Sequence, residues 1–391
     1  MIKKKWDIII VGGGLAGLSL AKQLSSQQFS HLDILLIEAR KQYFRDRTWS
    51  YWRDLTLPAH PFAALERTSW KAWQVKLSET VATQAHPDWR YCTIDSNTVY
   101  DDCLKTIHSA AHIDLRLDTR IMTIHDSKAP SIILESGEVI SASWIIDARQ
   151  SKVAVFNGIR SGLVQTFLGW EIQADSDVFD EQCVGLMHFI PNKSGLHFFY
   201  ILPYSKSNAL IETTWVCPVE FQINFDNELK KYLQEYYKLT NYTIQYFEKG
   251  ELPLDAEQSK LSQRVVKAGS SAGTLRASTG YAFLDTLAHN SKLISSLQQA
   301  ISSDKSSLDN WQPTAFRRKR LDLMMDRIFL MAIQKDYMYA PQLFMAMFST
   351  VDAQTLINFL NGQATWRQRL MIISALPKIR LIISALKVIF R

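Results

Sequence analysis

Residues 6–24 read WDIIIVGGGLAGLSLAKQL, and this stretch decides the fold class. The apolar run Ile8–Val11 predicts a buried strand, and three glycines then turn the chain into a helix. Gly12, Gly14 and Gly17 give the spacing G-x-G-x-x-G. In that spacing the first glycine permits a tight turn, the second lets a pyrophosphate approach the backbone, and the third lets the helix pack closely on the strand. The stretch therefore predicts a dinucleotide-binding site.

The residues after the glycines continue the same pattern. Leu15 and Ala16 open the expected helix, whose N-terminus attracts phosphate groups. The next predicted strand, DILLIEA, ends in Glu38, 21 residues after Gly17, where an acidic side chain can hold the ribose hydroxyls. The alternative is a glycine-rich turn that binds no ligand.

Two later segments are expected to return to the same site. SASWIIDARQ at 141–150 predicts an apolar strand that ends at Asp147, and VVKAGSSAGTLRASTGYAF at 265–283 predicts a loop of small residues before a helix. A fingerprint at the very start of a chain of this length favours FAD over NAD, although the second segment could be an ordinary loop. Besides the fingerprint, the residues expected to bind FAD are Glu38, Arg47, Asp147, Gly273, Ser278, Thr279 and Gly280.

The middle of the chain predicts a second sheet. Four strand-like runs follow one another, PYSKSN makes the last two a hairpin, and SWKAWQVKLS at 69–78 is a candidate for a further strand. The four runs are Leu163–Gln173, Val184–Ile190, Leu196–Pro203 and Ala209–Val216. The expected fold is α/β: a two-domain FAD-binding flavoprotein with a Rossmann-like nucleotide domain, an inserted antiparallel substrate-binding sheet and a helical C-terminal region.

We expect the chain to divide in the following way. The FAD-binding domain is expected to comprise residues 1–60, 97–160 and 255–305, the substrate-binding sheet 61–96 and 161–254, and the helical C-terminal region 306–391.

Two carboxylates lie on predicted strands of the inserted sheet. Period-two counting puts Glu171 on one face with Phe167 and Gly169, and Glu212 lies on another strand, in NALIETTWV. If both faces of the sheet are covered, burial raises the pKa of each carboxyl, and a carboxyl that is neutral at pH 7 can act as a general acid. The alternative is that each glutamate faces solvent at a sheet edge.

The overall composition limits the partners. A net charge of +6 fits an anionic partner, which could be nucleic acid, an anionic membrane or a phosphate-rich cofactor. Of these three, nucleic acid is not expected. The four cysteines are scattered without a C-x-x-C pair, which argues against a metal site or a disulfide frame and suits a reducing compartment. No uninterrupted apolar stretch of about 18 residues occurs, so a membrane-spanning helix is not expected.

Nearly the whole chain resembles one known family, the flavin-dependent lycopene beta-cyclases of the bacterial carotenoid cyclase type. RTWSYW and FLGWE are the most specific stretches, because few other flavoproteins carry both at these positions. Besides the glycine fingerprint, the resemblance is carried by RDRTWSYW (45–52), FLGWEI (167–172), FFYILPYSKSNALIETTW (198–215), RASTGYAF (276–283) and FLNGQATWRQRLMIISALP (359–377).

The resemblance implies a reaction. Bound FAD would work in its reduced form, with NAD(P)H supplying electrons and no net redox change. The terminal double bond of a linear lycopene end group would be protonated, close as a carbocation and lose a proton to give a beta ring. Glu212, in IETT, matches the family's essential acid, and Glu171, in the FLGWE-type motif, matches a second required carboxylate. Thr213 and His188 stand where the family often has acids, and His188 is either a substitute in proton return or structural.

A carbocation needs a dry pocket with electron-rich walls. Aromatic faces stabilise a desolvated cation by about 0.5–2 kcal/mol each. Trp49, Trp170 and Trp215 lie in or beside the motifs, and with His188 they are expected to line the substrate pocket. Core packing is the alternative for each of them.

The C-terminal segment suggests a membrane surface. Pro377 divides its apolar stretch into halves that are each too short to span about 30 Å of hydrocarbon. Beyond it, Arg380, Ser384, Lys387 and Arg391 form one basic stripe on an otherwise apolar helix, a pattern typical of an interfacial anchor. The alternative is a helix packed on its own domain. We expect a cytoplasmic protein peripherally attached to a membrane through this tail.

Two rival functions use the same scaffold. A flavin-dependent monooxygenase or isoprenoid reductase is one, but hydroxylases of this type usually carry Gly-Asp in the late flavin loop, and residues 268–283 contain no acid. A carotenoid-binding relative that has lost catalysis is the other. The pigment formed in a lycopene-accumulating bacterial host separates all three.

Overall fold

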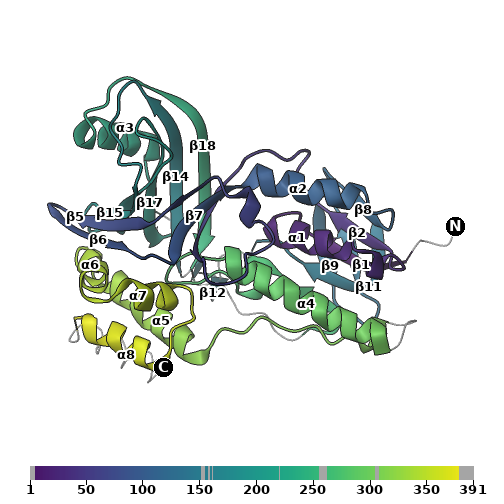
Figure 1. The fold of residues 1–391 in the computed structure, drawn as a ribbon. Helices are drawn as coiled ribbons and strands as arrows, with labels where there is room; N and C mark the ends of the chain where they lie inside the picture. Colours follow the sequence, from purple (N-terminus) through teal and green to yellow (C-terminus); the bar gives the residue numbers. More distant parts are fainter. Residues whose placement is uncertain are drawn as a thin grey trace.

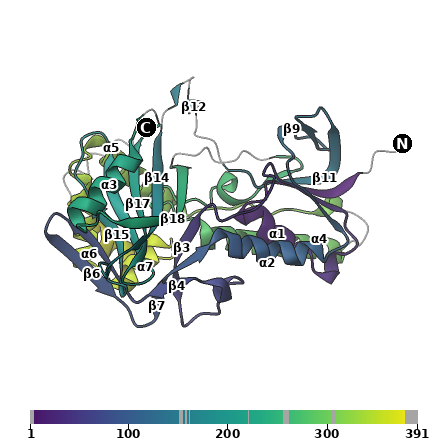
Figure 2. The same ribbon diagram turned by 90° about the horizontal axis from the view of Figure 1, so that it is seen from above.

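The computed structural model describes residues 5–150, 155–156, 159–160, 162–219, 221–254, 262–303 and 308–377. The predicted basic stripe at 380–391 lies outside these residues, so its role stays a prediction. Figure 1 shows the nucleotide-binding part at one end of the molecule, a large twisted sheet at the other, and the last helices beneath that sheet. Seen from above in Figure 2, the nucleotide-binding part and the last helices lie at opposite ends.

The nucleotide-binding part is a seven-stranded sheet in the order β8-β2-β1-β11-β10-β9, with β19 also pairing to β11. Its central strands β1 and β2 are short apolar runs buried on both faces. Helices cover one face, and residues of β10 and β11 pack against the other. The strands are β1 (Trp6–Val11), β2 (Ile34–Ile37), β8 (Ile113–Arg116), β9 (Ile121–His125), β10 (Ser131–Leu134), β11 (Val139–Asp147) and β19 (Val265–Lys267). The helices are α1 (Leu15–Leu24), α2 (Ser96–His108) and α4 (Phe283–Ser303).

The turn between β1 and α1 has the geometry that the glycine spacing predicts. Gly12 has φ +97°, in the left-handed region that favours glycine. A Cβ on Gly17 would lie 1.9 Å from the Gly12 carbonyl oxygen, so only glycine allows α1 to pack this closely on β1.

The second large sheet has seven strands in the order β18-β14-β17-β16-β15-β5-β6. All pairings are antiparallel except β15 with β5, so the predicted antiparallel sheet is in fact mixed. The strands are β5 (Ala72–Leu77), β6 (Thr80–Ala85), β14 (Leu163–Ala174), β15 (Cys183–Phe189), β16 (Leu196–Pro203), β17 (Asn208–Pro218) and β18 (Tyr242–Pro253). Helix α3 (Phe225–Tyr236) covers the outer face (Figure 1). The sequence analysis missed α3 and β18.

A three-stranded sheet in the order β3-β7-β4 lies between the two large sheets in both views. Its strands are β3 (Thr48–Asp54), β4 (Thr68–Trp70) and β7 (Trp89–Asp95), and a two-stranded pair consists of β12 (Val155–Phe156) and β13 (Ile159–Arg160). Four short 3₁₀ helices are η1 (Gln27–Phe29), η2 (Ala63–Leu65), η3 (Gly269–Ala272) and η4 (Leu308–Asn310). The domain boundaries expected from the sequence stay a prediction.

The last helices form a layer against the second large sheet. They are α5 (Arg320–Lys335), α6 (Ala340–Thr350), α7 (Ala353–Leu360) and α8 (Trp366–Ala375). Two buried ion pairs fix α5: Asp326 binds Arg276 of the late loop at 3.0 Å, and Asp322 binds Arg369 of α8 at 2.8 Å. Because the two aspartates are four residues apart, they lie on one face of α5. Among the residues that the structure describes, none of the helices combines the length and apolar character needed to cross a membrane.

Candidate functional site

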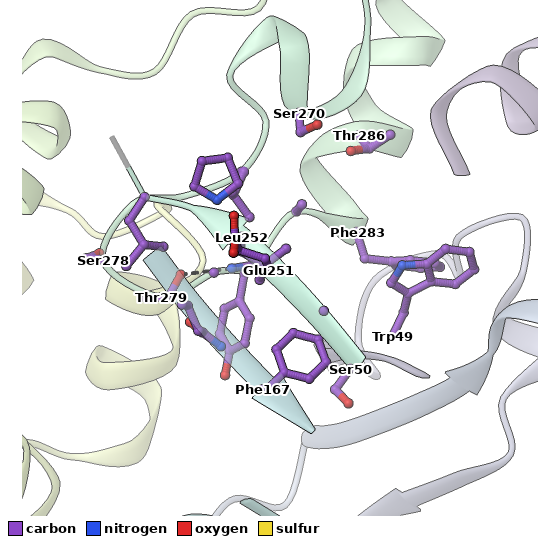
Figure 3. A pocket seen from close by; sticks show the side chains of 18 of the residues that line it. Trp49, Ser50, Phe167, Glu251, Leu252, Ser270, Ser278, Thr279, Phe283 and Thr286 are labelled. Carbon is purple, nitrogen blue, oxygen red and sulfur yellow. Dashed lines mark hydrogen bonds between the residues drawn. The ribbon is translucent and has the colours of Figure 1, made fainter. Parts of the chain in front are cut away.

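A cavity of about 1660 Å³ runs from the start of α1 to the C-terminal helices. Its first part is lined by the β1–α1 turn and the end of β2, and its far part by apolar side chains of β16, α5 and α6. Where the two parts meet, Trp49, Phe167 and the late loop with Ser278 and Thr279 line the cavity (Figure 3). A dinucleotide and a long apolar molecule can therefore meet at this junction.

The nucleotide end is built from predicted residues. Gly12, Gly14, Leu15 and Ala16 all line the cavity. Among the described residues outside its own helix and chain neighbours, no heavy atom lies within 4 Å of the position that a Cβ on Gly14 would take. The first turn of α1 also contains no acidic residue. No side chain among the described residues caps the N-terminus of α1, which borders the cavity and therefore suits the pyrophosphate of a dinucleotide.

Glu38 lines this end of the cavity as a carboxylate. Its Oε2 accepts a hydrogen bond from the Gly13 N–H at 2.5 Å, and its Oε1 accepts one from the Arg40 N–H at 2.9 Å. Burial disfavours the charge, but the hydrogen bonds and charge of Arg40 outweigh it, so the pKa of Glu38 lies below its usual range. The predicted Arg47 also lines the cavity. Its side chain is half exposed.

The late loop contributes Ser278, Thr279 and Gly280 to the cavity wall, as predicted. Asp147 and Gly273 are not among the described residues that line it, so their expected role as cofactor ligands stays a prediction. The Asp147 carboxylate pairs with Arg149 at 2.8 Å, and its carbonyl accepts the Ser271 hydroxyl at 2.8 Å. Gly273, at φ +88°, ends the η3 turn. Both residues therefore contribute to the conformation of the loop. Gly17 acts by letting α1 pack closely on β1.

Glu212 lies on β17 at the junction and lines the cavity. Its side chain is buried, and its Oε1 accepts a hydrogen bond from the Thr214 hydroxyl at 2.6 Å. Burial, followed by the nearby Glu248 carboxylate, raises the pKa of Glu212 to about 8. The group is therefore mainly protonated at neutral pH, which is the state that a general acid needs.

Glu171 is placed differently from the expectation. Arg67 binds it at 2.6 and 2.8 Å, and Arg45 binds the same carboxylate at 2.6 Å. Burial disfavours the charge, but the hydrogen bonds from Arg67 and Arg45 hold the pKa of Glu171 below its usual range. This environment favours the charged form of Glu171, so its expected role as a neutral acid stays a prediction that the geometry does not support. Since its pKa is lower in the folded chain, these pairs stabilise the fold above the ordinary carboxyl pKa and lose this effect as the pH falls.

Of the predicted pocket residues, Trp49 lines the cavity, and Trp170, Trp215 and His188 do not belong to the described wall. Trp170 and Trp215 belong to the core between the sheet and α3. Strand alternation explains this, because Trp170 neighbours Glu171 in sequence and Trp215 is three residues from Glu212.

His188 packs against α3. Its Nδ1 makes a 2.7 Å hydrogen bond with the Tyr232 hydroxyl of α3. Burial, with a smaller effect of Lys76, lowers the pKa of His188 to about 4, so the ring is neutral at pH 7. A position behind the sheet and a neutral ring do not suit a substitute for a cavity acid.

Sequence reasoning missed most of the apolar wall. Strand register could have found part of it: Phe198 and Tyr200 lie opposite Thr214 and Glu212, on the cavity face. The missed wall residues include Leu186, Leu196, Phe198, Tyr200, Val216, Phe329, Ile333 and Phe344. A buried glutamate on β18, Glu248, was also missed because the strand itself was not predicted.

Solved structures with the same architecture define the class. The geranylgeranyl bacteriochlorophyll reductase-like protein of Thermoplasma acidophilum aligns over 99% of this chain and all of its own length, with a TM-score of 0.62 and 11% identity. A complex of aklavinone-11 hydroxylase with FAD and aklavinone aligns over 91% of this chain and 73% of its own, with a TM-score of 0.60 and 13% identity. The fold is thus that of the two-domain FAD-binding flavoproteins.

Sequence comparison gives the family. The family described as "Lycopene cyclase protein" matches residues 7–386, so the chain belongs to the lycopene cyclase family. A lycopene beta-cyclase of Pseudescherichia vulneris is 27% identical over 285 residues, 70% of each chain. A chloroplastic lycopene beta cyclase of Solanum lycopersicum is 23% identical over 326 residues, 79% of this chain and 63% of that protein.

Proposed function

We propose that the protein is a carotenoid cyclase that converts the linear end groups of lycopene, or of a close relative, into beta-ionone rings. The observation that carries the proposal is Glu212, a buried and protonated carboxyl at the meeting point of a nucleotide site and a long apolar cavity. Membership of the lycopene cyclase family supports the substrate class.

Glu212 supplies the proton in this reaction. Its carboxyl proton adds to the terminal double bond of the substrate, which leaves a positive charge on the neighbouring carbon. The electron pair of a second double bond then forms the ring bond and moves the charge into the ring. A ring carbon beside the charge then gives its proton to the Glu212 carboxylate, and the electrons of that C–H bond restore a double bond. Substrate and product therefore have the same formula, the acid is regenerated and no net oxidation or reduction occurs.

The cavity residues fit FAD beside this reaction. The β1–α1 turn would hold the pyrophosphate, Glu38 the ribose, and the loop at Ser278–Gly280 the ring system. Reduced FAD, with NAD(P)H as the electron source, would supply negative charge next to the carbocation. The apolar side chains of β16, α5 and α6 would exclude water, which would otherwise quench the cation.

Product analysis tests the function. Purified protein with FAD, NAD(P)H and lycopene in liposomes should form a beta-cyclic product under anaerobic conditions. In D₂O each new ring should carry one deuterium, because its first added proton comes from an exchangeable carboxyl. A hydroxylated or hydrogenated product would instead identify a monooxygenase or a reductase, and bound carotenoid without conversion would identify a carrier.

Membrane attachment is part of the proposal, and α8 provides a surface for it. Four large apolar side chains of this helix are exposed: Trp366 by 67%, Leu370 by 56%, Met371 by 47% and Ile373 by 45%. Ile373 also lines the cavity. We propose that α8, continued by the predicted basic tail, lies in one leaflet on the cytoplasmic side, so that substrate passes from the bilayer into the cavity beside it.

We predict that the double variant Trp366→Ser, Leu370→Ser binds anionic liposomes at least about tenfold more weakly, since apolar area buried in the bilayer contributes about 25 cal/mol per Å². Flotation with liposomes measures the bound fraction. Met122→Ser is the matched control, because Met122 is 66% exposed on β9, away from α8. Equal binding of the double variant and the wild type would rule out α8 as the membrane surface.

A further inference from the structure

Two buried glutamates of the second large sheet flank a glycine. Gly169 of β14 pairs with Glu212 of β17 on one side and with Glu248 of β18 on the other. Directly paired residues project from the same face of a sheet, so both carboxyl side chains share the cavity face. A Cβ on Gly169 would lie 3.5 Å from the Glu212 Cβ and 3.4 Å from the Glu248 Cγ. No side chain of β14 therefore separates the two acids at this level of the sheet.

Glu248 sits behind the acid and is held in place. It is only 4% exposed and is not among the described residues that line the cavity. Its Oε2 accepts hydrogen bonds from the Tyr246 hydroxyl at 2.8 Å and the Thr48 hydroxyl at 3.0 Å. These contacts fix the carboxyl beside Glu212 and turn it away from substrate.

The charges around the pair differ on its two sides. Glu212 faces Glu248 and the neutral Tyr200 hydroxyl of β16. Glu248 also feels the positive charges of Arg45 and Arg47, which precede β3. Arg45 contacts Thr48 at 3.3 Å and is itself held by Glu171 at 2.6 Å. Positive charge is therefore concentrated on the Glu248 side, where a carboxylate is stabilised.

We propose that Glu212 and Glu248 hold one proton between them at neutral pH, with Glu248 as the charged positioning residue that keeps the proton on Glu212. Two adjacent buried carboxylates repel each other, so the second proton is lost only at higher pH. Burial raises the pKa of Glu248 to about 7, below the value of about 8 for Glu212, which agrees with this order of ionisation. Glu171 then contributes by fixing Arg45. The inference rests on the proposed function and assigns its proton source.

Infrared difference spectroscopy of FAD-loaded protein tests the pair without relying on activity. Protonated carboxyls give a resolved C=O band. We expect a band that disappears near pH 8 in the wild type and is absent in Glu212→Gln. In Glu248→Gln the negative neighbour is gone, so the Glu212 band should disappear at a pH lower by roughly one unit or more. Cyclisation requires protonated Glu212, so its alkaline limit should move down by the same amount while KM stays unchanged.

Glu228→Gln is the matched control, because Glu228 is a partly buried carboxylate on α3, against the opposite face of β17, where it accepts the Thr213 hydroxyl and the Trp215 N–H. Its spectrum and alkaline limit should match the wild type. Glu248→Asp keeps the negative charge, so its Glu212 band should shift less from the wild type than the band of Glu248→Gln. An unchanged Glu212 band in Glu248→Gln overturns the shared proton, even if cyclisation is confirmed. If the wild type forms no cyclic product, the proposed function is overturned. The infrared band shift would still test separately whether Glu212 and Glu248 share a proton.

Discussion

Replacing Glu212 with glutamine is expected to abolish cyclisation while the protein keeps its fold and its FAD. Glutamine has nearly the same shape and can still accept the Thr214 hydroxyl, so the buried site remains satisfied. It has no transferable proton, and general acid catalysis contributes about 10²–10⁴-fold to rates. Product formation per bound flavin should therefore fall by at least about 10²-fold, measured by chromatography of the carotenoids and by flavin absorbance.

Glu171→Gln is the comparison that separates a proton donor from a structural carboxylate. Glutamine cannot balance the charges of Arg45 and Arg67, and breaking a buried ion pair costs about 3–5 kcal/mol. This variant should unfold at a clearly lower temperature, whereas Glu212→Gln should not. Normal rates of product formation in Glu212→Gln would show that the acid is another residue.

The nucleotide end of the site could be predicted from the sequence because its determinants are local. The fingerprint, the helix start and the apolar strand all lie within residues 6–24, and glycine requirements follow from backbone geometry alone. Strands β14, β15, β16 and β17 of the second sheet were also predictable to within a few residues, since their apolar runs are bounded by turn residues.

The environment of each acid could not be predicted in the same way. Arg45 and Arg67 come from loops more than 100 residues before Glu171, and nothing local distinguishes a paired carboxylate from a free one. Glu212 and Glu171 therefore looked equivalent in the sequence, although the structure holds one neutral and the other charged. Trp170 and Trp215 were assigned by closeness in sequence, whereas alternation along the strand turns them to the opposite face.

Gly14→Val is expected to give a folded protein without FAD and without activity. The backbone at Gly14 has φ −77° and ψ −166°, a conformation that valine adopts without strain. The space around its Cβ position is open, so the added side chain would project into the place proposed for the pyrophosphate. Purified variant should unfold cooperatively near the temperature of wild-type apoprotein and show no flavin absorbance.

Gly17→Ala separates loss of binding from loss of structure. Its Cβ would lie 1.9 Å from the Gly12 carbonyl oxygen, so α1 must move away from β1 and the fold itself should be destabilised. If the turn had a structural role but did not bind FAD, Gly14→Val would leave the flavin content unchanged. The reason is that a Cβ on Gly14 has no heavy atom within 4 Å among the described residues outside its own helix and chain neighbours. Normal FAD in that variant would therefore place the pyrophosphate elsewhere. If Gly14→Val is stable but lacks FAD, the valine side chain must block binding on the cavity side of the turn, where we propose that the pyrophosphate lies.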